Sequence, residues 1–234
     1  MTASVSFPRG VADPQGRAGY IANAAGGIDA FDLQAGTLLW SSDAGARPLL
    51  TFDDRLAALA AVEGRRNAFR IVILDTHSGR VSLTADPFEL PEWVTVGADG
   101  ESFRIRAELH GETLRVAWSA QARYRGGANP PPQVLRQANK DAAGAIRIDL
   151  RTGRVESAER DDPAGTVGDD SPPAAVAGLE PTAQDIHIVG SRVFYVAESA
   201  GTESLKARDL ASGEVLWERT LGTRRAAKPR ALRP

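Results

Sequence analysis

Ala30-Phe31-Asp32-Leu33-Gln34-Ala35-Gly36-Thr37-Leu38-Leu39-Trp40 is the stretch that decides the fold, because it returns later as Ala207-Arg208-Asp209-Leu210-Ala211-Ser212-Gly213-Glu214-Val215-Leu216-Trp217. Ala, Asp, Leu, Gly, Leu and Trp occupy the same offsets in both copies. Such self-similarity is typical of a repeat protein, in which one unit specifies the architecture. The fold can therefore be derived from the repeated unit.

Each copy predicts a strand, a tight turn and a second strand. Asp can hydrogen-bond the backbone of the turn, and Gly supplies the positive φ that the reversal needs. Two weaker copies, at 75–79 and 149–153, keep only the turn, and Leu83 and Ser157 stand where the Trp would be. Those two units must therefore pack differently at that point. The predicted structural residues of the repeat are Asp32, Gly36, Trp40, Asp75, Gly79, Asp149, Gly153, Asp209, Gly213 and Trp217.

Short apolar runs bounded by Gly, Asp and Pro precede each turn, as expected of strands. Residues 55–62 and 69–74 lie before the second turn, and 186–189 and 192–197 lie before the fourth. About four strands per turn is the composition of one propeller blade. We predict an all-β fold, a small β-propeller with four blades of four antiparallel strands. It forms a single domain, with units at about 1–45, 46–90, 100–160 and 182–234.

The phrase Ala-x-Asp-Leu-x-x-Gly-x-x-x-Trp resembles the tryptophan-docking repeat of the PQQ-type, or quinoprotein-like, β-propellers. The resemblance implies that Trp40 and Trp217 lie between adjacent blades and pack on the neighbouring turn. Dehydrogenases of that family are longer, with eight blades, a calcium site and often a pair of adjacent cysteines. This chain has half as many units and no Cys. We therefore expect no PQQ-dependent dehydrogenase and no cofactor.

The length of the chain favours one four-bladed ring with long loops. Four turns in 234 residues give units of about 58 residues, against roughly 40 to 50 in propeller repeats. The surplus falls in Pro- and Gly-rich insertions at 125–140 and 161–181. An extra pair of strands within 84–103, or half of a larger ring closed by a second copy, are the alternatives. Ring closure would join the two ends, with the tail at 227–232 beside Val5 to Phe7; a flexible basic tail is the other reading.

Composition limits the classes of partner. A net charge of -2 and a pI near 6.0 give no overall field toward nucleic acid or anionic lipid. No stretch of 18 apolar residues predicts a transmembrane segment, and the first residues lack the features of a signal peptide. We expect a cytoplasmic protein as the sequence is written, or a periplasmic or secreted one if a leader has been removed.

The candidates for catalysis are few. Asp185 and His187 alternate on a predicted strand and face the same side, which would suit a base with its orienting carboxylate. A chance pair on a strand edge is the commoner explanation. Asp53 and Asp54 are further weak candidates. If the innermost strands line a channel, a hydrolase or lyase site at its mouth would use Asp53, Asp54, Arg104, Arg106, Asp185 and His187.

Candidates for metal and partner binding lie near the insertions. Asp161, Asp162, Asp169 and Asp170 could supply oxygens to a hard cation, although their spacing matches no EF-hand and a solvated acidic loop is the simpler reading.

The leading hypothesis is a non-catalytic binding or scaffold module that engages a protein or peptide through its loop-bearing face. Aromatic residues near loops are favoured at interfaces. The predicted binding residues are Trp93, Trp118 and Tyr124.

Overall fold

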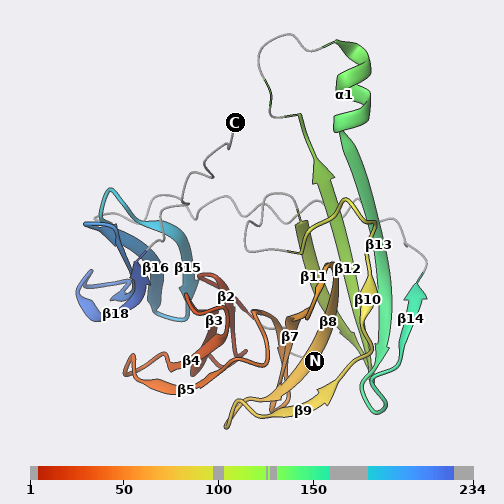
Figure 1. Ribbon diagram of the computed structural model, residues 1–234. Coiled ribbons are helices and arrows are strands. Elements are labelled where there is room, and N and C mark those ends of the chain that lie inside the picture. The colour runs from red at the N-terminus through yellow and green to blue at the C-terminus, as the bar shows by residue number, and fades with distance from the viewer. Residues whose placement is uncertain (1–4, 97–102, 125, 127–130, 159–178, 224–234) are drawn as a thin grey trace.

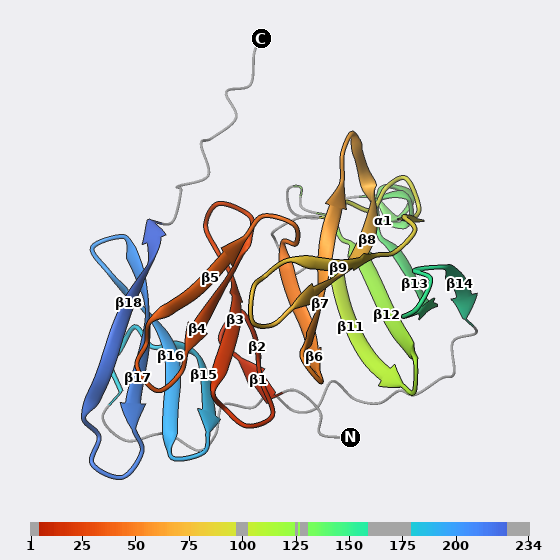
Figure 2. The ribbon, with the colours of Figure 1, turned by 90° about the horizontal axis from the view of Figure 1, so that it is seen from below.

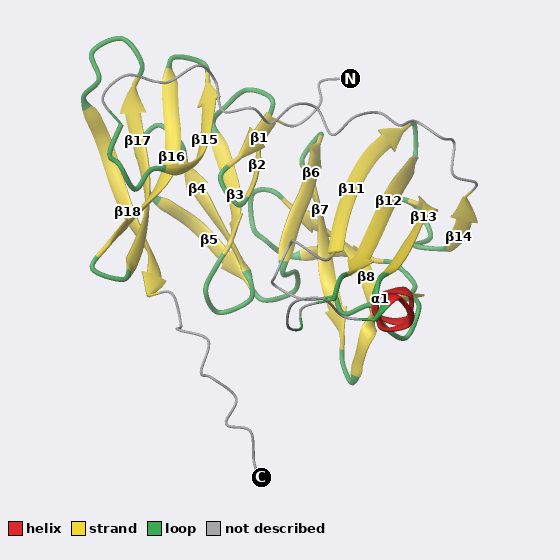
Figure 3. Ribbon diagram, turned by 90° about the horizontal axis from the view of Figure 1, so that it is seen from above, coloured by secondary structure: helices red, strands yellow, loops and turns green. Residues whose placement is uncertain are grey.

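The computed structural model describes residues 5–96, 103–124, 126, 131–158 and 179–223. Within these residues it consists of four antiparallel sheets and one short helix, α1 (Pro132–Ala138). Figure 1 shows the helix beyond the end of β12 and β13, and Figure 3 shows the sheets standing side by side.

Each sheet is an antiparallel meander in which consecutive strands pair, except that the last strand of the second sheet pairs with its third strand and not with its fourth. The first consists of β1 (Val5–Phe7), β2 (Gly10–Ala12), β3 (Ala18–Ala22), β4 (Ile28–Asp32) and β5 (Leu38–Ser42). The second consists of β6 (Arg47–Phe52), β7 (Arg55–Val62), β8 (Arg65–Asp75), β9 (Val81–Thr84) and β10 (Phe88–Glu89), with β9 and β10 both paired to β8.

The last two sheets have four strands each. The third consists of β11 (Phe103–His110), β12 (Thr113–Ala122), β13 (Lys140–Asp149) and β14 (Val155–Ala158). The fourth consists of β15 (Gln184–Val189), β16 (Arg192–Ser199), β17 (Thr202–Asp209) and β18 (Val215–Thr223). The prediction of an all-β fold with four propeller blades is confirmed. The first two blades each carry one strand more than the four expected.

The blades follow one another in chain order, and the fourth stands beside the first. Figure 2 shows the fourth blade beside the first, followed by the second and the third. The inner strands make the contacts: β1 with β15, β2 with β6, and β6 with β11. Between the described strands of the third and fourth blades no contact of this extent occurs, and the two blades stand at opposite ends of the row. The predicted meeting of the first and last repeats is therefore present, whereas closure between the third and fourth blades is absent from the described residues.

The predicted pairing of the C-terminal tail cannot be followed, because residues 224–234 lie outside the described residues. Val5–Phe7 pairs with Gly10–Ala12 in a hairpin of its own.

The four Asp-Gly turns share one hydrogen-bonding pattern. In the first, Asp32 Oδ1 accepts the backbone N–H groups of Gln34 and Ala35, each at 2.7 Å. The N–H of Gly36 then donates to the carbonyl of Asp32 at 2.8 Å, with φ of +67° at the glycine. The other three turns repeat this arrangement around Asp75, Asp149 and Asp209, with Gly79, Gly153 and Gly213 also at positive φ.

Tryptophan joins neighbouring blades at two of these turns. Trp40 of the first blade donates from Nε1 to the carbonyl of Thr76 at 2.7 Å, and its ring covers Gly79 of the second blade. Trp217 of the fourth blade donates to the carbonyl of Leu33 at 3.2 Å and covers Gly36 of the first. Both indoles are buried, so each contact combines apolar burial with a satisfied N–H.

The remaining two turns are covered differently. Gly153 of the third blade lies against Leu83 and the carbonyl of Thr84, so a leucine replaces the tryptophan there. At Gly213 of the fourth blade the nearest described atoms belong to Arg208 of the same blade, which donates to the Gly213 carbonyl. Within the described residues, docking contacts therefore join the fourth blade to the first, the first to the second, and the second to the third.

We predict that Gly79→Ala destabilises the protein more than Gly64→Ala. Both glycines have positive φ, +68° and +73°, so an alanine is strained at each by about 1–2 kcal/mol. At Gly79 a Cβ would also stand 2.6 Å from Trp40, whereas at Gly64 no atom of the described residues would lie within 4 Å of it. Displacing the indole adds about 1–3 kcal/mol. Urea unfolding of the two variants measures the difference, and equal losses would contradict a stabilising role for the docked indole.

Candidate functional site

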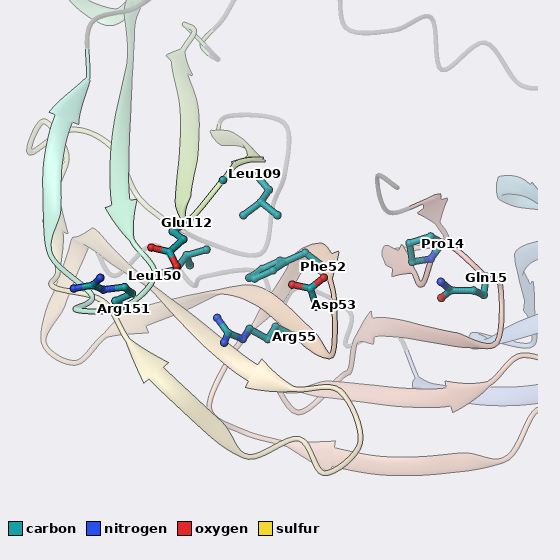
Figure 4. A pocket seen from close by; sticks show the side chains of 10 residues that line it. Pro14, Gln15, Phe52, Asp53, Arg55, Leu109, Glu112, Leu150 and Arg151 are labelled. Atoms are coloured by element: carbon teal, nitrogen blue, oxygen red, sulfur yellow. The ribbon is translucent and has the colours of Figure 1, made fainter. Parts of the chain in front are cut away.

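A cavity of about 640 Å³ lies where the turns of three blades meet. Its volume is in the range of ligand-binding pockets. The first blade contributes Pro14 and Gln15 from the turn between β2 and β3. The second contributes the turn between β6 and β7, and the third contributes the turns between β11 and β12 and between β13 and β14. The other lining residues are Phe52, Asp53, Arg55, Leu109, Gly111, Glu112, Leu150 and Arg151, most of them labelled in Figure 4.

Backbone hydrogen bonds hold these turns in place. The N–H of Leu150 donates to the carbonyl of Glu112 at 3.0 Å, which ties together the two turns of the third blade. The N–H of Thr76 donates to the carbonyl of Asp54 at 3.0 Å in the second blade. Asp53 adopts φ of +46°, a conformation that Asp tolerates better than most residues. The lining is therefore built on tight, fixed turns.

The cavity combines apolar residues with charges of both signs. Phe52 and Leu150 are buried and Leu109 is half-buried. Asp53, Arg55, Glu112 and Arg151 are exposed. Within the part of the chain that the structure describes, none of these four charged side chains forms an ion pair. Two carboxylates and two guanidinium groups are thus available to a bound molecule.

Asp185 and His187 lie away from this cavity, between the fourth and first blades. Asp185 Oδ1 is 2.8 Å from His187 Nε2, and its Oδ2 accepts the backbone N–H of Arg9 at 2.7 Å. The Arg9 guanidinium pairs with Glu203 at 2.5 Å. Both Arg9 and Asp185 have positive φ, and β15 is bulged between Gln184 and His187. This cluster joins two blades by hydrogen bonds and one ion pair.

The pKa of Asp185 reflects these contacts. Burial raises the pKa, but the hydrogen bonds from His187 and from the Arg9 backbone, with the attraction of both side chains, outweigh burial and lower it. The carboxylate is therefore held in its charged form, as suits a structural acceptor.

The six residues expected at a channel mouth do not come together. Asp53 lines the cavity, while Asp54 occupies the same turn without being among the lining residues. Arg104 and Arg106 are exposed on β11, and Asp185 and His187 belong to the cluster between blades. Within the described residues, no group of three or more His, Cys, Asp or Glu is placed to hold a metal ion. The predicted metal ligands Asp161, Asp162, Asp169 and Asp170 lie outside the described residues.

The three aromatic residues predicted for binding do not form one surface. Trp118 is 8% exposed and packs in the core beside Phe88 and Gly144, so its assignment to a binding surface is wrong. The alternation of buried residues along β12 places it inside, a signal already present in the sequence. Trp93 is half-buried against the same core, and Tyr124 is half-buried near Asn139, which accepts its backbone N–H.

Sequence reasoning identified Asp53 alone among the charged residues of the cavity. Arg55, Glu112 and Arg151 each stand in or next to a tight turn, which is the signal that could have indicated them. Their convergence depends on how the blades sit side by side.

No protein-family model and no curated protein matches the sequence. Among solved structures, the Dos1 propeller matches with a TM-score of 0.38 and 12% identity, over 93% of this chain and 48% of that one. Hydrazine synthase of Kuenenia stuttgartiensis matches at 0.36 and 12%, over 93% and 50%. The quinohemoprotein alcohol dehydrogenase ADHIIG of Pseudomonas putida HK5 matches at 0.35 and 12%, over 88% and 33%. The chain spans half or less of these structures, and likenesses this distant carry no argument about activity.

Among the described helices, none is long and apolar enough to cross a membrane.

We predict that Asp185→Asn loses stability at neutral pH and that this loss disappears in acid. The pKa of Asp185 is lowered by folding, so its contribution is fully present above the unfolded value of about 3.9 and is lost as the pH falls through the folded pKa. Unfolding free energies of the wild type and the variant from pH 7 to pH 2 should converge at the acid end. Asp43→Asn, at an exposed carboxylate for which the described residues offer no hydrogen bond, is the control of equal charge. A difference that stays constant with pH would contradict this account.

Proposed function

We propose that this protein is a non-catalytic β-propeller module that binds a peptide segment of another protein in the cavity between its first three blades. The observation that carries the proposal is the lining: apolar side chains at Phe52, Leu109 and Leu150, with two carboxylates and two guanidinium groups around them. A peptide offers the matching groups, since it carries apolar side chains, charges of both signs and backbone donors and acceptors.

The position of the cavity changes which end of the propeller is proposed to bind. The insertion that carries α1 follows β12, at the end of the third sheet opposite to the turn between β13 and β14 (Figure 1). The cavity is at the end with the β13–β14 turn. We therefore assign binding to the tight turns in place of the loop-bearing face expected from the sequence.

A binding role agrees better with this geometry than the hydrolase or lyase alternative. An acid–base mechanism needs its donor and acceptor groups within reach of one substrate atom. Asp185 instead accepts a hydrogen bond from the Arg9 backbone and contacts His187. We also infer that the tryptophan-docking turns belong to the PQQ-type repeat, on the strength of the two indole contacts.

Selection of a phage-displayed library of random 12-residue peptides on the immobilised protein tests the proposed function. We expect enriched sequences whose synthetic peptides bind in fluorescence anisotropy. We expect Asp53→Asn with Arg55→Gln to weaken that binding by about tenfold or more, because each lost charged contact is worth about 1–2 kcal/mol.

The matched control is Glu63→Gln with Arg66→Gln. These residues are exposed at the turn between β7 and β8, the opposite end of β7 from Arg55, and the pair removes the same charges. Peptides that bind the cavity variant and the control equally well, or a selection that enriches nothing over an unrelated protein, would overturn the proposal.

A further inference from the structure

The third blade has one face that no other blade covers in the described part of the chain. From Thr113 to Ala120 on β12, partly exposed residues alternate with buried ones. The corresponding interior strands of the other blades are β3, β7 and β16. Each contains a run of four or five consecutive buried residues, so both faces of these strands are covered. On the fourth blade the outer face packs against Leu179, Ala183 and Ile186. The third blade is therefore the open end of the row in Figure 2.

Strand register shows which residues share this face. Arg104 pairs with Ser119, Arg106 with Ala117, and Glu108 with Arg115 across β11 and β12. Residues that pair directly point to the same side of an antiparallel sheet. On β13, Ala143 pairs with Ser119, Ala145 with Ala117, and Arg147 with Arg115, so these residues lie on the same side of the sheet. The face thus combines a central strip of small side chains with four arginines.

The charges on this face do not balance. Glu108 lies 3.7 Å from Arg115, and Glu156, which pairs with Arg147 in the register, is 3.4 Å from Arg154. Arg104, Arg106 and Arg147 are exposed, and none of them forms an ion pair with any residue that the structure describes. A protein of net charge -2 therefore presents a local excess of positive charge on one flat sheet face.

We propose that this face binds an extended acidic polypeptide segment whose carboxylates stand at alternate positions. Arg104 and Arg106 are two residues apart on β11, which separates their side chains by roughly 6.4–6.8 Å along the strand. An extended peptide presents alternate side chains with the same period. The small residues Ala117, Ser119 and Ala143, which are partly or fully exposed, leave room for its backbone beside the guanidinium groups, which hydrogen-bond carboxylates strongly.

A second copy of this chain fits the face less well. Two copies packed face to face would place arginines against arginines, a repulsive arrangement. Packing against the outer face of a second copy's fourth blade would require removing Leu179 and Ala183, and with them the ion pair of 2.7 Å between Glu180 and Lys206.

Nucleic acid is disfavoured by the carboxylates on the same face. Glu108 and Glu156 flank Arg115 and Arg147, so a continuous phosphate backbone would meet negative charge as well as positive. This surface shares no residue with the cavity between the blades. Binding of an acidic segment here is therefore independent of peptide binding in the cavity.

The test is fluorescence anisotropy with a fluorescein-labelled peptide of five Glu-Thr repeats at low ionic strength. We expect saturable binding. The affinity should fall at least about tenfold in the double variant Arg104→Gln with Arg106→Gln. It should fall by a similar factor for the wild type when salt is raised to about 0.3 M, because exposed charges are then screened. The control is Arg17→Gln with Arg80→Gln, exposed arginines of the first two blades, which changes the net charge by the same amount. Asp53→Asn with Arg55→Gln should leave this binding unchanged.

Four outcomes would overturn the proposal. The first is equal binding to the two arginine variants. The second is equal binding by a peptide of the same composition with its glutamates in one block, which lacks the alternation. The third is binding of a single-stranded DNA 10-mer as tight as that of the peptide. The fourth concerns the variant in which Asp161, Asp162, Asp169 and Asp170 are all changed to Asn. If the peptide binds this variant but not the wild type, the acidic stretch of the chain itself is the occupant.

Discussion

The packing of a tryptophan on a glycine turn is the interaction on which the arrangement of the blades depends. Each indole buries its ring on the neighbouring blade and donates its N–H to a carbonyl that the turn leaves free. The glycine is required twice over, because its φ is positive and because any Cβ would occupy the place of the ring. A short turn held by one aspartate thus becomes a rigid platform for the next blade.

This contact also explains why the blades are not equivalent. The fourth, first and second blades are joined by two tryptophans, while the second blade meets the third through Leu83. The third blade has Ser157 where a tryptophan would extend the series, and Ser157 is exposed. Its sheet consequently ends with one face that the other described blades do not cover. The fourth blade is closed at its far side by the segment around Leu179 and Ala183, as the terminal unit of a repeat protein needs.

Two features with different chemistry follow from this arrangement. The cavity gathers turns from three blades and combines apolar residues with charges of both signs. The open face of the third blade is flat and mainly cationic, with Arg104, Arg106 and Arg147 exposed. Asp185 and His187, which alternate on one strand like a catalytic pair, instead join two blades through Arg9. A pair of titratable residues at suitable spacing is therefore insufficient evidence of catalysis.

The sequence by itself determined the blade, because its turns and strands depend on local interactions, and the four Asp-Gly turns favoured a count of four. The Asp-Gly turns form hydrogen bonds within five residues, and the alternation of apolar residues fixes which side of each strand is buried. The same alternation marks Trp118 as a core residue.

Only the tertiary structure decided which turns line the cavity and which face of the third blade the other described blades leave uncovered, because these depend on contacts between residues far apart in the chain. Trp217 meets Leu33 across 184 positions, and Arg9 meets Asp185 across 176. No local pattern encodes such pairings, so the grouping of Asp53, Arg55, Glu112 and Arg151 around one cavity could not be read from their positions in the sequence.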